Sequence, residues 1–281
     1  MRLRSLLFVP GDRPERMEKA LGLGADALIL DLEDSVAPAS KAVARAAVSG
    51  FLLGTPARQA SEEKGPSLFV RVNPVDSDFF VDDLVAVLGS KPDGLVLPKA
   101  EGAATVRHLA DRSGVPILPI ATETPAAVFR LGEYVEVSGE LCGLTWGAED
   151  LPAAIGAAAS RDAEGGYLPP YQTVRALTLF GAHAAGVPAI ETVYPAIKDL
   201  DGLRRTAEAA ARDGFSGMMA IHPAQVPVIN EAFTPSPEQV ARARTIVEAF
   251  AAEPHAGVLQ IDGKMIDAPH LKQARRILER V

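Results

Sequence analysis

Cysteine is almost absent from this sequence of 281 residues, because Cys142 is the single one. One cysteine excludes an intrachain disulfide and a zinc site built from several thiolates, and it fits a reducing compartment. Basic residues are in the minority, with 28 Lys and Arg against 36 Asp and Glu and a net charge of −8. We therefore expect no nucleic-acid partner, and any anionic ligand needs a local cluster of cations.

Long apolar runs are also missing. The run Leu6–Val9 is shorter than the roughly 7 to 15 residues of a signal-peptide core, and no stretch reaches the roughly 18 apolar residues of a membrane span. We therefore expect a cytoplasmic protein with no membrane partner. The apolar fraction of 48%, with 24 Gly and 22 Pro spread along the chain, predicts a globular protein with a sizeable core.

Eight short aliphatic runs alternate with longer segments of helical periodicity. We expect strands over Ser5–Val9, Ala27–Asp31, Leu68–Val72, Gly94–Leu97, Ile117–Ile120, Leu141–Trp146, Val187–Ile190 and Gly217–Ile221. Strands that are apolar on both faces and separated by helices pair in parallel beneath a layer of helices. Eight such units predict an α/β fold of the (β/α)8 TIM-barrel type, and the turn with Gly22 and Gly24 lacks the GxGxxG fingerprint of a doubly wound sheet.

The chain continues past the eighth predicted strand. Helical patterns cover three further segments, which are Pro223–Phe233, Pro237–Ala252 and Pro269–Val281. A turn-rich segment, Pro254–Pro269, separates the last two. We expect residues 1–222 to form the catalytic barrel and residues 223–281 to form a C-terminal helical extension that covers the mouth or reaches a neighbouring subunit. Gly54–Pro66, which has little to bury, is the expected flexible loop.

Polar residues gather directly after the predicted strands, where the active sites of TIM barrels lie. They include Arg13, Asp31, Glu33, Asp34, Arg71, Asn73, Lys99, Glu123, Glu149, Asp150, Glu191, Tyr194 and His222. Carboxylates so placed repel one another unless a cation sits among them, and oxygen ligands without cysteine suit Mg²⁺ or Mn²⁺ rather than zinc. Glu123 with Asp150 is a candidate ligand pair. The alternative is that the strand-end carboxylates cap helices or pair with nearby cations.

Two cations at the predicted mouth each admit two interpretations. Arg71 ends an apolar strand, where a guanidinium is costly to bury without an anion. It either binds a substrate carboxylate or pairs with Asp31 or Glu33. Lys99 suits a Schiff-base role if an apolar mouth lowers its pKa, and otherwise it forms a salt bridge to a site carboxylate.

A small basic cluster lies near the start of this acidic chain. Arg13, Arg16 and Lys19 recur every three residues on the first turns of a predicted helix. Cations on one face, near free backbone N–H groups, can form a phosphate site. A solvated helix face is the alternative interpretation.

Eight short motifs resemble those of one known family. They are Leu7–Gly11, Leu30–Val36, Val70–Pro74, Leu97–Lys99, Gly147–Leu151, Val193–Pro195, Ile221–Gln225 and Gly263–Asp267. Together and in this order they resemble the citrate lyase β-subunit-like family of the HpcH/HpaI aldolase/citrate lyase superfamily, which includes malyl-CoA and citramalyl-CoA lyases. Each motif is short, but eight in register make accidental similarity implausible.

The resemblance implies a lyase with Mg²⁺, or alternatively Mn²⁺, as its cofactor. Its substrate would be a β-hydroxyacyl-CoA such as malyl-, citramalyl- or citryl-CoA, cleaved into or formed from an acyl-CoA and a 2-oxo acid. Carried over by residue, the resemblance implies that Glu123 and Asp150 are the metal ligands. Glu33 and Asp34 would be partners of metal-bound water.

The resemblance also implies the substrate contacts. Arg71 would hold the oxo-acid end, and Phe8, Arg13 and Lys19 would contact the adenine and phosphates of coenzyme A. Asp267, in the C-terminal extension, would be the general acid/base, donated to a neighbouring subunit of a homotrimer or homohexamer.

Three other activities stay open on the same residues. The first is a malyl-CoA thioesterase or malate-synthase-like activity, and the second is a free-acid pyruvate aldolase that needs no coenzyme A. The third is a citrate lyase β subunit that depends on an acyl carrier and is inactive alone. The chain departs from the common family pattern at Pro119–Pro125 and at Thr145–Trp146, both at the predicted mouth. These departures bear on the substrate more than on the metal.

Overall fold

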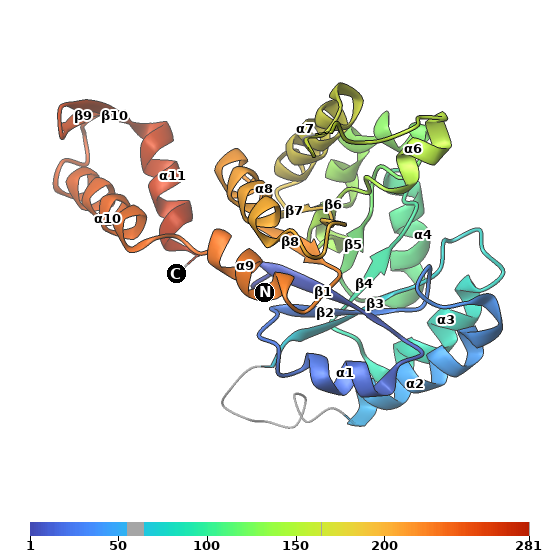
Figure 1. Ribbon diagram of the computed structural model, residues 1–281. Helices are drawn as coiled ribbons and strands as arrows, with labels where there is room; N and C mark the ends of the chain where they lie inside the picture. The colour runs from blue at the N-terminus through green and yellow to red at the C-terminus, as the bar shows by residue number, and fades with distance from the viewer. Residues whose placement is uncertain (55–64, 164, 281) are drawn as a thin grey trace. The chain divides into compact units, whose positions relative to one another are not determined.

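Eight parallel strands form the barrel of the computed structural model, which describes residues 1–54, 65–163 and 165–280 (Figure 1). The strands are β1 (Ser5–Pro10), β2 (Ala27–Asp31), β3 (Ser67–Arg71), β4 (Gly94–Leu97), β5 (Ile117–Pro119), β6 (Leu144–Thr145), β7 (Ala189–Glu191) and β8 (Gly217–Ala220). Their order is β5-β4-β3-β2-β1-β8-β7-β6. Parallel bridges from Ile117 to Leu141 and from Ile120 to Thr145 connect the two ends of this sheet. The predicted TIM barrel is confirmed.

Helices follow the strands and surround the sheet (Figure 1). They are α1 (Pro14–Ala20), α2 (Lys41–Gly54), α3 (Phe80–Val87), α4 (Ala103–Ser113), α5 (Pro125–Val128), α6 (Asp150–Ile155), α7 (Pro169–Ala184), α8 (Leu200–Asp213) and α9 (Gln225–Ala232). Proline in the first turn begins α1, α5 and α7, where its missing N–H costs nothing. Glycine at positive φ ends α4 at Gly114 and α8 at Gly214. Local sequence therefore sets several helix boundaries.

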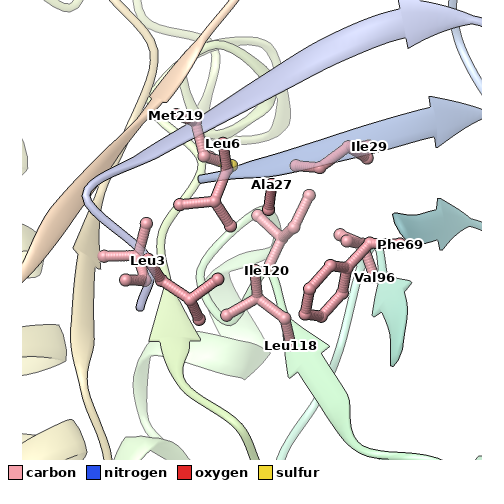
Figure 2. Packing of buried hydrophobic residues seen from close by; sticks show 10 residues of the cluster. Leu3, Leu6, Ala27, Ile29, Phe69, Val96, Leu118, Ile120 and Met219 are labelled. Atoms are coloured by element: carbon pink, nitrogen blue, oxygen red, sulfur yellow. The ribbon is translucent and has the colours of Figure 1, made fainter. Parts of the chain in front are cut away.

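The barrel interior is filled by aliphatic side chains around one aromatic ring. Phe69 on β3 packs among residues from neighbouring and facing strands, which are Leu6, Ala27, Ile29, Val96, Leu118, Ile120, Ile190 and Met219 (Figure 2). Gly94 makes room for the ring, because a Cβ there would lie 2.4 Å from Phe69 Cε1. The interior is a packed core, so chemistry is confined to the ends of the strands.

The barrel unit spans Met1–Asn230 and so includes all but the last two residues of α9. Asn230 fastens this helix to the barrel, since its Oδ1 accepts a hydrogen bond from Ser5 Oγ at 2.7 Å and its Nδ2 donates to the Gly24 carbonyl at 2.8 Å. The expected boundary at residue 222 lies before this helix. Residues 55–64 of the predicted loop Gly54–Pro66 lie outside the described residues.

A second compact unit, Glu231–Val281, contains α10 (Pro237–Ala252), β9 (Val258–Ile261), β10 (Lys264–Asp267) and α11 (Ala268–Leu278). Its small core consists of Ala243, Ile246, Ile266 and Ala274. The segment expected only to be turn-rich is an antiparallel hairpin, which corrects that prediction. Asp262 and Gly263 both have positive φ, and an Asp-Gly pair is a strong hairpin signal. In the described part of the chain, no helix has the length and apolar character needed to cross a membrane.

Candidate active site

The carboxyl ends of β2 and β3 place Asp31 beside Arg71, because the parallel register pairs these two residues. Arg71 donates from Nε and Nη2 to the two carboxylate oxygens of Asp31, both at 2.7 Å. Its Nη1 lies 2.7 Å from Glu33 Oε2. Asp31 and Glu33 are buried, and 11% of the Arg71 side chain is exposed. Of the two interpretations of Arg71, the structure therefore shows pairing with Asp31 and Glu33.

The two carboxylates around Arg71 differ in acidity. Burial raises the pKa of Asp31, but the charge of Arg71 and hydrogen bonds from Arg71, Ser35 and the Glu33 amide outweigh it and leave this pKa below its ordinary value. For Glu33 the balance reverses, because burial outweighs its pairing with Arg71 and Lys99 and raises its pKa. Glu33 therefore takes up a proton more readily than Asp31.

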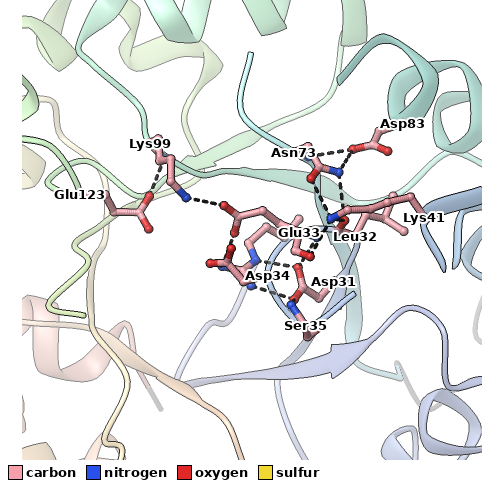
Figure 3. Close-up of polar contacts among 11 residues, drawn as sticks. Asp31, Leu32, Glu33, Asp34, Ser35, Lys41, Asn73, Asp83, Lys99 and Glu123 are labelled. Carbon is pink, nitrogen blue, oxygen red and sulfur yellow. Dashed lines mark hydrogen bonds and ion pairs between the residues drawn. The ribbon is translucent and has the colours of Figure 1, made fainter. Parts of the chain in front are cut away.

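Lys99 links this cluster to Glu123. Its Nζ donates to Glu33 Oε1 at 2.6 Å, and its backbone N–H donates to Glu123 Oε2 at 2.5 Å (Figure 3). Lys99 has a φ of 50°, a left-handed conformation that costs energy for a residue other than glycine. Burial lowers the pKa of Lys99, but pairing with Glu33 outweighs it and raises this pKa. The salt-bridge interpretation of Lys99 is confirmed, and a raised pKa opposes a Schiff-base role, which needs the neutral amine.

Glu123 and Asp150 meet at the ends of neighbouring segments of the ring. Glu123 is 4% exposed. Burial raises its pKa well above the ordinary value, and the Asp150 carboxyl, which lies within hydrogen-bonding reach, raises it further. Gly147 makes this arrangement possible, since a Cβ there would lie 2.6 Å from Glu123 Cγ.

These two carboxylates fit a hard divalent cation. Two acidic groups in contact, one of them buried, are unfavourable unless a proton or a cation lies between them, and oxygen ligands suit Mg²⁺. Among the described residues, no group of three or more His, Cys, Asp or Glu is arranged to hold a metal. Two protein ligands, Glu123 and Asp150, would leave positions on a magnesium ion for water and substrate oxygens.

Of the other residues predicted to act in the site, some lie beside Arg71 and others lie on the protein surface. The guanidinium of Arg71 lies over the Phe8 ring, 4.8 Å from its centroid, so Phe8 belongs to the cluster. The side chain of Arg13 is 56% exposed and lies 3.7 Å from Asp12, and Lys19 is exposed at the end of α1. Asp34 is also exposed, 3.8 Å from Arg71. The structure gathers Phe8 and Asp34 around Arg71 and leaves Arg13 and Lys19 on the surface of α1.

Asp267 begins α11 in the second unit. Its side chain caps the helix, and its Oδ1 lies 2.5 Å from His270 Nδ1. The Asp267 side chain is 30% exposed. His270 is a partner that the sequence analysis did not include. The role of Asp267 in a neighbouring subunit stays a prediction.

Comparison with known proteins identifies the family. The model of the HpcH/HpaI aldolase/citrate lyase family matches residues 4–223. A second model, described as a C–C bond lyase of the TIM-barrel fold, matches residues 176–281. The chain belongs to the HpcH/HpaI aldolase/citrate lyase family. Both the predicted family and the predicted enzyme class, a carbon–carbon lyase, are confirmed.

Family members of known name are similar over nearly the whole chain. A citrate lyase subunit beta-like protein of Mycobacterium tuberculosis is 38% identical over 274 residues, covering 98% of this chain and 94% of the relative. A (3S)-malyl-CoA thioesterase of Cereibacter sphaeroides is 35% identical over 279 residues, covering 98% and 93%. The crystal structure of CitE from M. tuberculosis in complex with magnesium, acetoacetate and coenzyme A has a TM-score of 0.83 and 36% identity, covering 99% of this chain and 98% of that one.

The sequence analysis did not single out one buried cation, Lys41. Lys41, the first residue of α2, is 6% exposed and donates to the backbone carbonyls of Leu32 and Glu33 and to Asn73 Oδ1. Counting charges along the sequence could not show that Lys41 is buried, because a lysine at the start of a helix is usually solvated. The only local signal was that a cation is disfavoured at a helix N-terminus.

A second group lies at the ends of β6 and β7. The Trp146 Nε1 donates to Glu191 Oε1 at 2.6 Å, and Arg175 Nε donates to Glu191 Oε2 at 2.5 Å. Trp146 is fully buried and lies 5.0 Å from the Tyr167 ring. The departure from the family pattern at Trp146 is therefore a buried indole that Glu191 holds in place.

Proposed function

We propose that this chain is a Mg²⁺-dependent lyase that cleaves a β-hydroxyacyl-CoA into an acyl-CoA and a 2-oxo acid. The observation that carries the proposal is the meeting of Glu123 and Asp150 next to a row of paired charges, Lys99, Glu33 and Arg71. The relative CitE, described with magnesium, acetoacetate and coenzyme A, supports the same ligand classes here.

Glu123 and Asp150 would hold the ion, with Glu33 and Asp34 behind them as acceptors for bound water. When bound, Mg²⁺ supplies Lewis-acid stabilisation for the hydroxyl and carboxylate oxygens of the substrate. Glu33 and Lys99 border a cavity of about 400 Å³, which Asn73 and Phe79 also line. The cavity gives a small acid room beside the charged row.

Cleavage would require the protein's own residues to bind the substrate carboxylate, to stabilise the developing charge and to transfer a proton. Arg71 would pair with the carboxylate of the oxo acid and offset the charge that develops on the thioester oxygen. As the C–C bond breaks, its electron pair would pass to the acyl thioester as an enolate, and the substrate hydroxyl would give its proton to the Asp267 carboxylate. Asp267 would then protonate the enolate carbon, a step worth about 10² to 10⁴ in rate.

Coenzyme A would be held through α1. Phe8 lies at the mouth, and Arg13 and Lys19 present exposed cations that suit phosphate groups. The proposal includes a homotrimer or homohexamer in the cytoplasm, in which Asp267 serves the barrel of a neighbouring subunit. The contact of its Oδ1 with His270 Nδ1, at 2.5 Å, supports an acid/base role, because the imidazole can orient the carboxyl.

The test is a panel of malyl-, citramalyl- and citryl-CoA with Mg²⁺, with Mn²⁺ and with EDTA, and with products identified by mass spectrometry. We expect an acyl-CoA and a 2-oxo acid from at least one thioester, and loss of the activity in EDTA. Equal activity on free citramalate would contradict the thioester assignment. Activity in EDTA, together with trapping of pyruvate on Lys99 by borohydride, would overturn the metal mechanism.

Thioester hydrolysis is the second candidate. It is favoured by the 35% identical relative from C. sphaeroides, which is a (3S)-malyl-CoA thioesterase. The same panel separates the two reactions. Hydrolysis of malyl-CoA releases malate and free coenzyme A, whereas cleavage releases glyoxylate and acetyl-CoA.

A further inference from the structure

Lys41 is a buried ammonium that is surrounded by neutral acceptors. Its Nζ donates to the Leu32 carbonyl at 2.6 Å, to the Glu33 carbonyl at 2.8 Å and to Asn73 Oδ1 at 2.9 Å (Figure 3). These three bonds use all three hydrogens of the ammonium. In the described part of the chain, no carboxylate oxygen lies within ion-pair distance of Nζ. The Lys41 side chain is thus held in a single arrangement.

Local energetics disfavour a lysine at this position. Lys41 is the first residue of α2, where the positive end of the helix dipole repels a cation, and burial removes its hydration. Arg45, one turn later, has carboxylate partners instead, since its Nε donates to the buried Asp83 at 2.7 Å and its Nη1 lies 3.2 Å from Asp82. Both cations lie near the ring of Phe79, at 5.4 and 5.8 Å from its centroid. Packing on Phe79 therefore does not distinguish them.

What distinguishes Lys41 is the pair of loops that it joins. Leu32 and Glu33 follow β2, and Asn73 follows β3, where its Nδ2 donates to the Leu32 carbonyl at 2.9 Å. Lys41 thereby connects the backbone that carries Glu33 to the loop just past Arg71. The Glu33 carboxylate in turn contacts Lys99 Nζ, and the Lys99 amide contacts Glu123. A displacement of the Glu33 backbone would be passed along this row.

We propose that Lys41 is a positioning residue that fixes the Glu33 backbone and so places the Glu33 carboxylate between Arg71 and Lys99. The kinetic part of this assignment rests on the proposed lyase function. Residues behind a metal site typically change activity or metal affinity by about 10- to 100-fold when they are replaced.

The matched pair of variants is Lys41→Met and Arg45→Met, each of which removes one cation of α2 and keeps an unbranched side chain. We expect Lys41→Met to lower kcat by about tenfold or more, with a much smaller change in KM for the thioester, and to weaken Mg²⁺ binding measured by calorimetry. Arg45→Met should keep both values while lowering Tm. Wild-type kcat and Mg²⁺ affinity in Lys41→Met would overturn the assignment, and so would an equal loss in Arg45→Met.

A rescue experiment covers the case in which Lys41→Met is poorly folded. In Lys41→Ala, n-propylammonium matches the atoms removed beyond Cβ, and we expect it to restore kcat with saturation while leaving Arg45→Met unchanged. If the wild-type protein cleaves none of the thioesters, the proposed function fails separately. Mg²⁺ affinity then decides, because weaker binding in Lys41→Met than in Arg45→Met supports the role of Lys41, and equal binding removes it.

Discussion

At the scale of single residues, stability and function oppose each other at Glu123. Its raised pKa means that the folded metal-free protein holds the Glu123 proton more tightly than the unfolded chain does. The stabilising contribution is complete below the unfolded pKa and is lost as the pH rises through the folded one. As the pH rises above the unfolded pKa, the buried Glu123 carboxyl therefore contributes less and less to the stability of the metal-free protein, and a bound cation would remove this penalty.

Glu123→Gln should raise the Tm of the metal-free protein at pH 7 and weaken Mg²⁺ binding by at least about tenfold. The neutral amide avoids the charge that burial disfavours, but it is a poor ligand. Thermal melts from pH 5 to 8 with EDTA, and calorimetric titration with Mg²⁺, measure the two effects. Glu136→Gln, on an exposed side chain paired with Arg107, is the control and should change little. A lower Tm together with unchanged Mg²⁺ affinity would refute this account of Glu123.

Gly147→Ala tests whether the position of Glu123 matters. The added methyl would lie 2.6 Å from Glu123 Cγ, so the carboxylate must move. We expect Mg²⁺ affinity to fall by about tenfold, an effect of the size seen when groups around a metal site are disturbed. Gly50→Ala is the control, because its Cβ would meet nothing within 4 Å and alanine favours a helix interior by about 0.5–1 kcal/mol. Equal Mg²⁺ affinity in both variants would argue against Glu123 as a ligand.

At the scale of elements, substitutions at helix N-termini can distinguish a structural role of Asp267 from a chemical one. Asp267→Asn keeps a good N-cap residue and removes the acid. We expect Tm and thioester binding to stay near wild type while kcat falls by about 10² to 10⁴. Ser236→Ala, which removes the cap of α10 in the same unit, should instead cost about 1 kcal/mol of stability and leave kcat unchanged. Full turnover in Asp267→Asn would end the proposed role of Asp267.

At the scale of the whole molecule, the proposal requires Asp267 and Glu123 of different subunits to form one site. Asp267→Asn and Glu123→Gln should each be inactive alone. Mixed oligomers, made by unfolding and refolding the two variants together, should regain activity because some sites combine an intact barrel with an intact Asp267. Assays of the mixture against each refolded variant measure this complementation. Activity no higher than the sum of the separate variants would place Asp267 in its own subunit's site.

The fold was largely predictable from the sequence, because burial imposes its pattern locally. Strands covered on both faces are apolar along their length, as in β4 and in β2 up to Asp31, and proline and glycine mark helix ends. The hairpin β9–β10 was missed even though Asp262-Gly263 is its signal, because its strands are half exposed and carry little periodicity.

The candidate site, like the fold, was predictable from the sequence only in part. Position after a strand was enough to select Glu33, Arg71, Lys99 and Glu123, because parallel strands bring their carboxyl ends to one mouth. Which partner each charge takes was decided only by tertiary structure. Arg71 meets Asp31 because β2 and β3 pair in that register, and Lys41 meets Asn73 across 32 positions of sequence. Pairing depends on distances of a few tenths of an ångström between segments far apart in the chain, and no local pattern encodes such distances.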